Sequence, residues 1–147
     1  MIRFEVLTRK RIDEILEIEK LCFPGDEWTY SMFESELDNR ISVFIVGIDE
    51  DTDSVVCYGC VWLIADIGDI TNIAVSPDYQ GQGLGDRTLE LLITLCVENG
   101  MSVINLEVKK ENFPAVSLYK KHGFEEVGVR KGYYKDGSAA VLMSKYL

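Results

Sequence analysis

The segment most suited to ligand chemistry is the glycine-rich run Gln80-Gly81-Gln82-Gly83-Leu84-Gly85. Glycine permits positive φ and lets backbone N–H groups come close to a ligand. Where such a loop opens a helix, the unpaired N–H groups and the helix macrodipole attract phosphate. The run is not a P-loop, because no Gly-Lys-Ser/Thr follows it, and it does not match the G-x-G-x-x-G dinucleotide fingerprint. It predicts a pyrophosphate site, with a tight turn that binds nothing as the alternative.

Two polar residues farther along the chain could act on a ligand held by this loop: Glu107 and Tyr119. Glu107 lies near the end of an expected strand, on its more polar face. Tyr119 follows Asn112 by about two helical turns, so both side chains can face one ligand. Periodicity alone still favours the plainer interpretations, a solvated strand glutamate and a core tyrosine.

The cysteines are the other residues with possible chemistry. Cys57 and Cys60 have the C-x-x-C spacing of metal and redox sites. They lie in an expected strand, however, where positions i and i+3 point to opposite faces. The chain has one histidine and no second C-x-x-C, which disfavours a four-ligand zinc site. We expect packing cysteines and no metal.

Strands and helices succeed one another along the chain, and these elements must position the candidate residues. Ser31 and Glu34 form a plausible capping box for the second helix, and residues 67–69 are expected to turn. Strands are expected at 2–7, 42–48, 55–65, 70–75, 102–108, 124–132 and 139–145. Two helices are expected to begin at residue 12 and after residue 85, and two more to span residues 31–39 and 114–122. The pattern predicts an α/β (α+β) fold with about seven strands in one sheet and about four helices, as a single domain over 1–147.

Bulk composition is that of a globular protein: of 147 residues, 47% are hydrophobic and 27% are charged. No apolar run approaches the roughly 20 residues of a membrane span, and the N-terminus lacks signal-peptide features. We therefore expect a cytoplasmic protein without a membrane partner. The net charge of −10 argues against nucleic acid as a partner. It suits a cationic acceptor, or it only keeps the protein soluble.

The segment 72–85 resembles the acetyl-CoA motif of the GNAT superfamily of N-acetyltransferases, written Q/R-x-x-G-x-G/A. Gln80, Gly83 and Gly85 match it. The resemblance covers nearly the whole chain and is strongest to the RimI type, which acetylates the N-terminal alanine of a small-subunit ribosomal protein. Further matching pieces are Phe23-Pro24, Trp28, Phe33, Leu106-Glu107-Val108, Asn112, Leu118-Tyr119, His122-Gly123-Phe124, the run 130–134 and Asp136-Gly137.

This resemblance implies a mixed, mostly antiparallel sheet and acetyl-CoA as the acetyl donor. It implies that the strand before the loop pairs with the pantetheine arm, that the loop amides bind the pyrophosphate and that an asparagine contacts the cofactor. The cofactor-binding residues would be Ile73, Ala74, Val75, Gln80, Gly81, Gln82, Gly83, Leu84, Gly85, Asp86 and Asn112. Asp86 is unusual, because it would repel a phosphate. The adjacent Arg87 could offset that repulsion.

Acetyl transfer to an amine sets its own requirements. The amine attacks a thioester only when neutral, yet an α-amine with a pKa of about 7.7–8.0 is mostly protonated at pH 7. The reaction needs a base, an acid for the leaving thiolate and an N–H donor for the oxyanion. The resemblance makes Glu107 the base and Tyr119 the acid, with an amide near Val75 as the oxyanion donor. His122 is expected to be structural. The cysteines have no base partner, so direct attack in a ternary complex is favoured over an acyl-enzyme.

The resemblance makes the N-terminus of a basic ribosomal protein the expected acceptor. One alternative is a GNAT enzyme for a small-molecule amine or a lysine side chain. Another is a CoA-binding module without catalysis, which the presence of both Glu107 and Tyr119 disfavours. Trp28, Tyr133 and Tyr134 could wall a peptide groove, or they could be ordinary packing residues.

Overall fold

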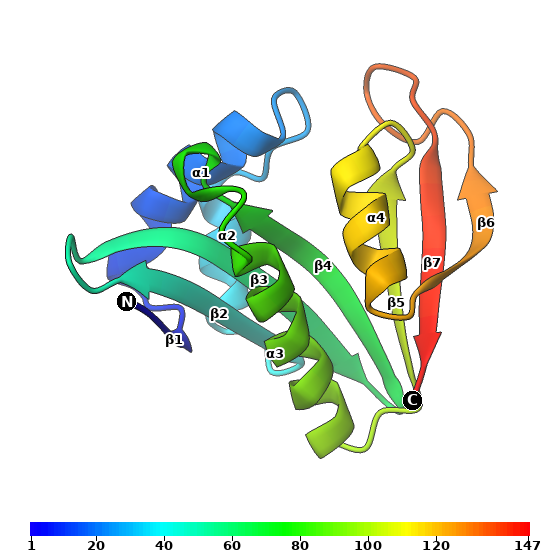
Figure 1. Cartoon of the computed structure of the whole chain (residues 1–147), viewed down its shortest axis with the longest axis horizontal. Coiled ribbons are helices and arrows are strands. Elements are labelled where there is room, and N and C mark those ends of the chain that lie inside the picture. Colours follow the sequence, from blue (N-terminus) through cyan, green and yellow to red (C-terminus); the bar gives the residue numbers. More distant parts are fainter.

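A computed structural model describes all 147 residues and contains one seven-stranded sheet with four α-helices (Figure 1). The strands are β1 (Ile2–Val6), β2 (Ser42–Asp49), β3 (Ser54–Ile64), β4 (Ile67–Val75), β5 (Val103–Lys109), β6 (Glu125–Arg130) and β7 (Ala140–Tyr146). The helices are α1 (Ile12–Cys22), α2 (Tyr30–Glu36), α3 (Leu84–Glu98) and α4 (Phe113–Lys121). The strand order is β1-β2-β3-β4-β5-β7-β6, and β4 with β5 is the parallel pair. The predicted fold class is confirmed.

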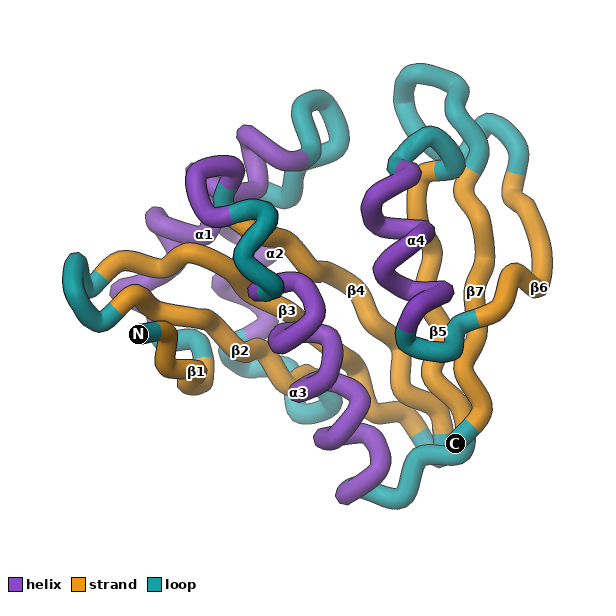
Figure 2. Tube along the Cα trace, viewed as in Figure 1, coloured by secondary structure: helices purple, strands orange, loops and turns teal.

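The helices cover the sheet on both faces. The apolar stripe of α1, with Ile12, Ile15 and Ile18, packs with Phe33 of α2 against β2, β3 and β4. Leu89, Leu92 and Cys96 of α3 are buried on the other face, in one cluster with Tyr119 of α4. The alternation expected for β5 is present, since Ile104, Leu106 and Val108 all join this second cluster. Figure 2 shows α3 and α4 as two separate helices, with β4 visible between them.

The parallel pair opens part-way along its length. Residues Ile67–Ile70 of β4 pair with Val103–Leu106 of β5, and no pairing follows. A bulge lies at this point, because Ile70 and Asn72 face successive residues of β3 and Thr71 has no partner. A bulge bends its strand and increases the local twist. The remaining lengths of β4 and β5 therefore diverge, as Figure 1 shows.

Two local expectations were wrong. The cap of α2 is Thr29, whose hydroxyl accepts a hydrogen bond from the amide of Met32 at 3.3 Å, and Ser31 lies inside the helix. Glu34 pairs with Arg9 instead of closing a capping box. Residues 67–69 extend β4, because burial already alternates from Ile67 onward. The chain turns earlier, at Ala65, which has a φ of 53°.

The C-x-x-C pair serves packing, as expected from its place in a strand. Cys57 lies on the α3 side, with its Sγ 3.5 Å from the hydroxyl of Thr88. Cys60 packs on the α1 side, with its Sγ 3.2 Å from the hydroxyl of Ser42. All four thiols are free. No helix has the length and apolar character that a membrane crossing requires.

Candidate active site

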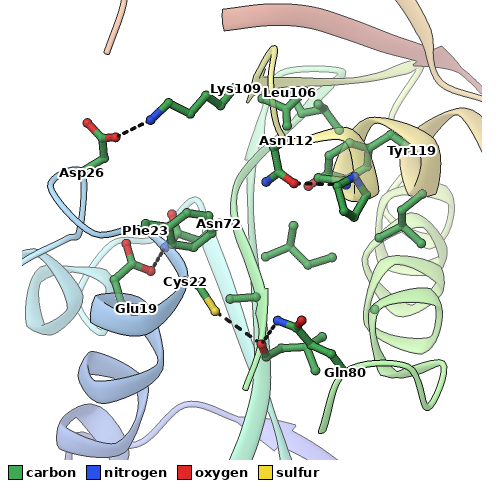
Figure 3. Close-up of a pocket in the computed structure, with 18 of the residues that line it drawn as sticks. Glu19, Cys22, Phe23, Asp26, Asn72, Gln80, Leu106, Lys109, Asn112 and Tyr119 are labelled. Atoms are coloured by element: carbon green, nitrogen blue, oxygen red, sulfur yellow. Dashed lines mark hydrogen bonds and ion pairs between the residues drawn. The ribbon is translucent and has the colours of Figure 1, made fainter. Parts of the chain in front are cut away.

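A cavity of about 1430 Å³ occupies the opening between β4 and β5. Figure 3 shows Gln80 near one end of it, with Asp26 and Lys109 at the other. Every predicted site residue except Gln82 lines this cavity: Ile73, Ala74, Val75, Gln80, Gly81, Gly83, Leu84, Gly85, Asp86, Glu107, Asn112 and Tyr119. The structure thus brings together residues that the sequence spreads over 47 positions, from 73 to 119.

The glycine loop has the geometry that its composition predicts. Gly81 and Gly83 have φ values of +82° and +80°, in the left-handed region that favours glycine. Gly83 is the N-cap of α3, and no side chain caps this end. The N–H groups of the first helical turn therefore have no acceptor within the helix and are available to an anion.

The open edge of β4 presents backbone groups to the cavity. The carbonyl oxygen of Val75 accepts from Nε2 of Gln80 at 3.1 Å and from Sγ of Cys22 at 3.3 Å, so it points away from β3. The N–H and C=O of one strand residue point to the same edge, and successive residues alternate between edges. Ile73 and Val75 therefore turn their polar backbone groups to the cavity. Those of Ala74 turn to β3.

Asp86 contacts two side chains at the C-terminal end of α4. Its Oδ1 lies 2.9 Å from Nζ of Lys121 and 2.8 Å from Nε2 of His122. These contacts, that of Lys121 first, lower the pKa of Asp86. The expectation that Arg87 offsets this charge was wrong, because its guanidinium lies over the ring of Phe4 at 5.3 Å. Such a position follows from the helix, on which adjacent side chains point in different directions. His122 links α3 to α4, which agrees with a structural role.

Tyr119 enters the cavity from α4. It is 5% exposed, and its ring packs edge-on against Phe124 with 5.8 Å between centroids. Burial, and to a lesser degree Tyr134, raises the pKa of Tyr119 above its ordinary value of 10. The hydroxyl therefore carries its proton at neutral pH, as a general acid must.

Glu107 approaches from the other side of β5. Its neighbours Leu106 and Val108 are buried among the α3 and α4 residues, so the strand alternation turns Glu107 to the opposite face. Its carboxylate lies 3.2 Å from Nη2 of Arg130. The cavity thus holds a carboxylate that can accept a proton and a protonated hydroxyl that can donate one.

Asn112 begins α4 and also reaches the cavity. Its Oδ1 accepts from the amide of Ala115 at 3.3 Å, which caps the helix. Its Nδ2 points into the cavity, as Figure 3 shows. One side chain can therefore position α4 and donate to a bound ligand.

Comparison with known proteins identifies the family. The model of the acetyltransferase (GNAT) family matches residues 12–124. The chain belongs to the GNAT family. The match spans α1, β4, the glycine loop, β5 and α4, which form most of the cavity wall.

Individual relatives agree with this GNAT assignment. A Bacillus subtilis (strain 168) protein provisionally named [ribosomal protein bS18]-alanine N-acetyltransferase is 39% identical over 134 residues, which cover 90% of this chain and 87% of that protein. The Escherichia coli (strain K12) [ribosomal protein bS18]-alanine N-acetyltransferase is 34% identical over 107 residues, 73% of this chain and 70% of the relative. A crystal structure of the E. coli S18-alanine N-acetyltransferase superposes with a TM-score of 0.90 at 28% identity, over 99% of this chain and 94% of that one. The chain is therefore a GNAT acetyltransferase by both sequence and fold.

Sequence reasoning missed Glu19, a buried carboxylate in the cavity wall. It is 1% exposed, and it accepts hydrogen bonds from Nδ2 of Asn72 and the amide of Trp28, each at 3.0 Å, and from the hydroxyl of Tyr58. Burial raises the pKa of Glu19. A glutamate in register with the apolar stripe of α1 was the available signal. Its contacts fix the segment after α1 against the bulged part of β4.

The three aromatic candidates for a peptide groove, Trp28, Tyr133 and Tyr134, do not all lie at the cavity. Trp28 and Tyr134 line the cavity, and Trp28 also packs on Phe33 with 5.3 Å between ring centroids. Tyr133 is 47% exposed and stands outside the cavity lining. Only two of the three residues can therefore wall the cavity.

Proposed function

We propose that this GNAT enzyme transfers the acetyl group of acetyl-CoA to the N-terminal alanine of a ribosomal protein in the cytoplasm. The names of the B. subtilis and E. coli relatives support this acceptor. The observation that carries the proposal is that one cavity holds Glu107 and Tyr119 beside the open edge of β4. We infer that both groups act at one reacting centre in the opening between β4 and β5.

The cavity suits acetyl-CoA. The left-handed glycines and the uncapped start of α3 provide N–H groups for the pyrophosphate. Ile73 and Val75 offer backbone groups along the open edge for the pantetheine amides, and Nδ2 of Asn112 offers another donor. Because Nζ of Lys121 lies beside Asp86, the ammonium offsets the carboxylate charge near the start of α3.

The same geometry supports direct attack. The carboxylate of Glu107 accepts a proton from the acceptor ammonium, and the neutral nitrogen then forms the new N–C bond. The N–H of Val75 points to the open edge, where it can stabilise the oxyanion. The C–S bond breaks as the hydroxyl of Tyr119 donates its proton to the leaving sulfur, and the second proton that the nitrogen loses passes through solvent to the Tyr119 phenolate. Arg130 fixes the orientation of Glu107 through its ion pair.

A peptide panel tests the acceptor. The panel contains basic peptides that begin with alanine, matched peptides with other first residues, N-terminally blocked peptides with an internal lysine, and free amines. The alanine-first peptides should give the highest kcat/KM, with acetylation at the α-amine by mass spectrometry. If free amines surpass every peptide, the proposed acceptor is wrong while the acetyltransferase family assignment stands.

A further inference from the structure

A single lysine joins two loops at the cavity end remote from the glycine loop. Nζ of Lys109 lies 3.4 Å from Oδ2 of Asp26 and 2.9 Å from Oδ2 of Asp136. Asp26 follows α1, Lys109 ends β5, and Asp136 belongs to the connection between β6 and β7. The ammonium also lies 5.3 Å from the ring centroid of Tyr134. Figure 3 shows the contact between Lys109 and Asp26 at this end of the cavity.

This ion triad carries one negative charge in excess, because two carboxylates share one ammonium. The hydrogen bond from Lys109 holds the pKa of Asp136 well below its usual range. The Lys109 and Asp26 side chains are 30% and 22% exposed, and that of Asp136 is 58% exposed. A second cation can therefore reach the carboxylates from solvent.

The place of the triad relates it to the acceptor. If the glycine loop holds the cofactor phosphates, the opposite end of the cavity is the one left open to the acceptor. All three triad residues line that end, together with Tyr134. Residues that follow the acceptor's N-terminus must then pass close to Asp26 and Asp136.

We propose that Asp26 and Asp136 bind a basic side chain of the acceptor peptide in exchange for Lys109. The triad would thus determine specificity, and the inference rests on the proposed function. Lys109 holds the two loops in place in the free enzyme and releases the carboxylates when the acceptor arrives. An arginine suits this exchange best, because its planar guanidinium can donate to both carboxylates at once.

The test uses pairs of alanine-first peptides that differ only by arginine or glutamine at the second, third or fourth position. In the wild type, the arginine peptide of at least one pair should have a KM about fivefold lower than its glutamine twin. Added salt should reduce this preference. Asp26→Asn and Asp136→Asn should each reduce the preference for the arginine peptide. Lys109→Met should increase this preference, because it removes the competing cation. Lys110→Met is the matched control, since Lys110 is exposed and forms no ion pair, and it should leave the preference unchanged.

The outcomes separate this inference from the proposed function. No transfer to any alanine-first peptide would contradict the proposed function itself. Transfer with equal KM for arginine and glutamine twins at all three positions overturns only the role of the triad. If the variants change the KM of the arginine peptide and of its glutamine twin by the same factor, the role of the triad in specificity is also overturned. The triad would then only hold the two loops in place. If an Asp variant does not fold, the salt dependence of the wild type and the Lys109→Met result decide.

Discussion

The two walls of the cavity contribute different kinds of chemistry. The β4 wall, with the glycine loop, offers backbone groups from Ile73, Val75 and the start of α3. The β5 wall offers side chains: Glu107 from the strand and Tyr119 from the helix that follows. A wall of backbone groups tolerates changes of side chain but depends on φ and ψ. A wall of side chains depends on single functional atoms, so substitutions should affect binding on one wall and turnover on the other.

The largest effect is expected on the β5 wall. Tyr119→Phe removes a proton donor and little volume, so kcat should fall by about 10²–10⁴-fold. Steady-state kinetics with a saturating alanine-first peptide measures this loss. Phe124→Leu is a control that alters the packing partner of Tyr119 without removing the hydroxyl. An unchanged kcat in Tyr119→Phe, with the chemical step shown to limit the rate, would exclude Tyr119 from the mechanism.

The raised pKa of Tyr119 also makes a pH prediction. Because burial moves this pKa above 10, the hydroxyl stays protonated through the alkaline range. The wild-type kcat should therefore remain level between about pH 8 and pH 10, provided the fold is intact by circular dichroism. A fall centred near pH 9 would show that the catalytic acid is another group.

Glu107→Gln should give a loss that depends on pH. An α-amine with a pKa of about 7.7–8.0 needs a base at pH 7 but is already neutral at pH 9. The variant should lose about 10²-fold or more in kcat/KM at pH 7 and clearly less at pH 9. A pH–rate profile parallel to that of the wild type would instead make Glu107 a positioning residue.

Glu19→Gln tests the buried hydrogen bonds that hold the segment after α1 against the bulged part of β4. An amide has one acceptor oxygen for the three donors that surround Glu19, so at least one buried donor loses its partner. The cost should be about 2 kcal/mol of unfolding free energy, or about 5 °C in Tm. Thermal denaturation checks this value against Glu17→Gln, an exposed glutamate of the same helix. Equal Tm values for the two variants would contradict the assigned contacts.

The smallest effect is expected from Gly83→Ala. A Cβ at this position meets no atom within 4 Å, so the strain comes only from the left-handed φ of +80°. That strain is about 1–2 kcal/mol, which corresponds to roughly tenfold weaker acetyl-CoA binding if the loop relaxes. The thermal stabilisation by acetyl-CoA should shrink accordingly. Gly100→Ala is the control, because Gly100 has a φ of +75° and equal free space at the other end of α3.

Local patterns predicted most of the strands and helices and the geometry of the glycine loop, while the mixed, mostly antiparallel pairing of the strands was implied by the GNAT resemblance. Positive φ at Gly81 and Gly83, and the alternation in β5, follow from residue type and period.

The partners of charged residues could not be predicted from residue type and period. Asp86 pairs with Lys121 and His122, which lie 35 and 36 positions away, and the adjacent Arg87 points elsewhere. The bond from Lys109 to Asp26 spans 83 positions, so it depends on the complete fold.

The difference between the two walls is tested most directly by calorimetric titration of acetyl-CoA into the wild type, Gly83→Ala and Tyr119→Phe, with kcat measured on the same samples. Gly83→Ala should bind acetyl-CoA about tenfold more weakly. Tyr119→Phe should bind it as the wild type does while its kcat falls by about 10²-fold or more. The account is contradicted if Tyr119→Phe loses as much affinity as Gly83→Ala, or if Gly83→Ala binds acetyl-CoA with wild-type affinity.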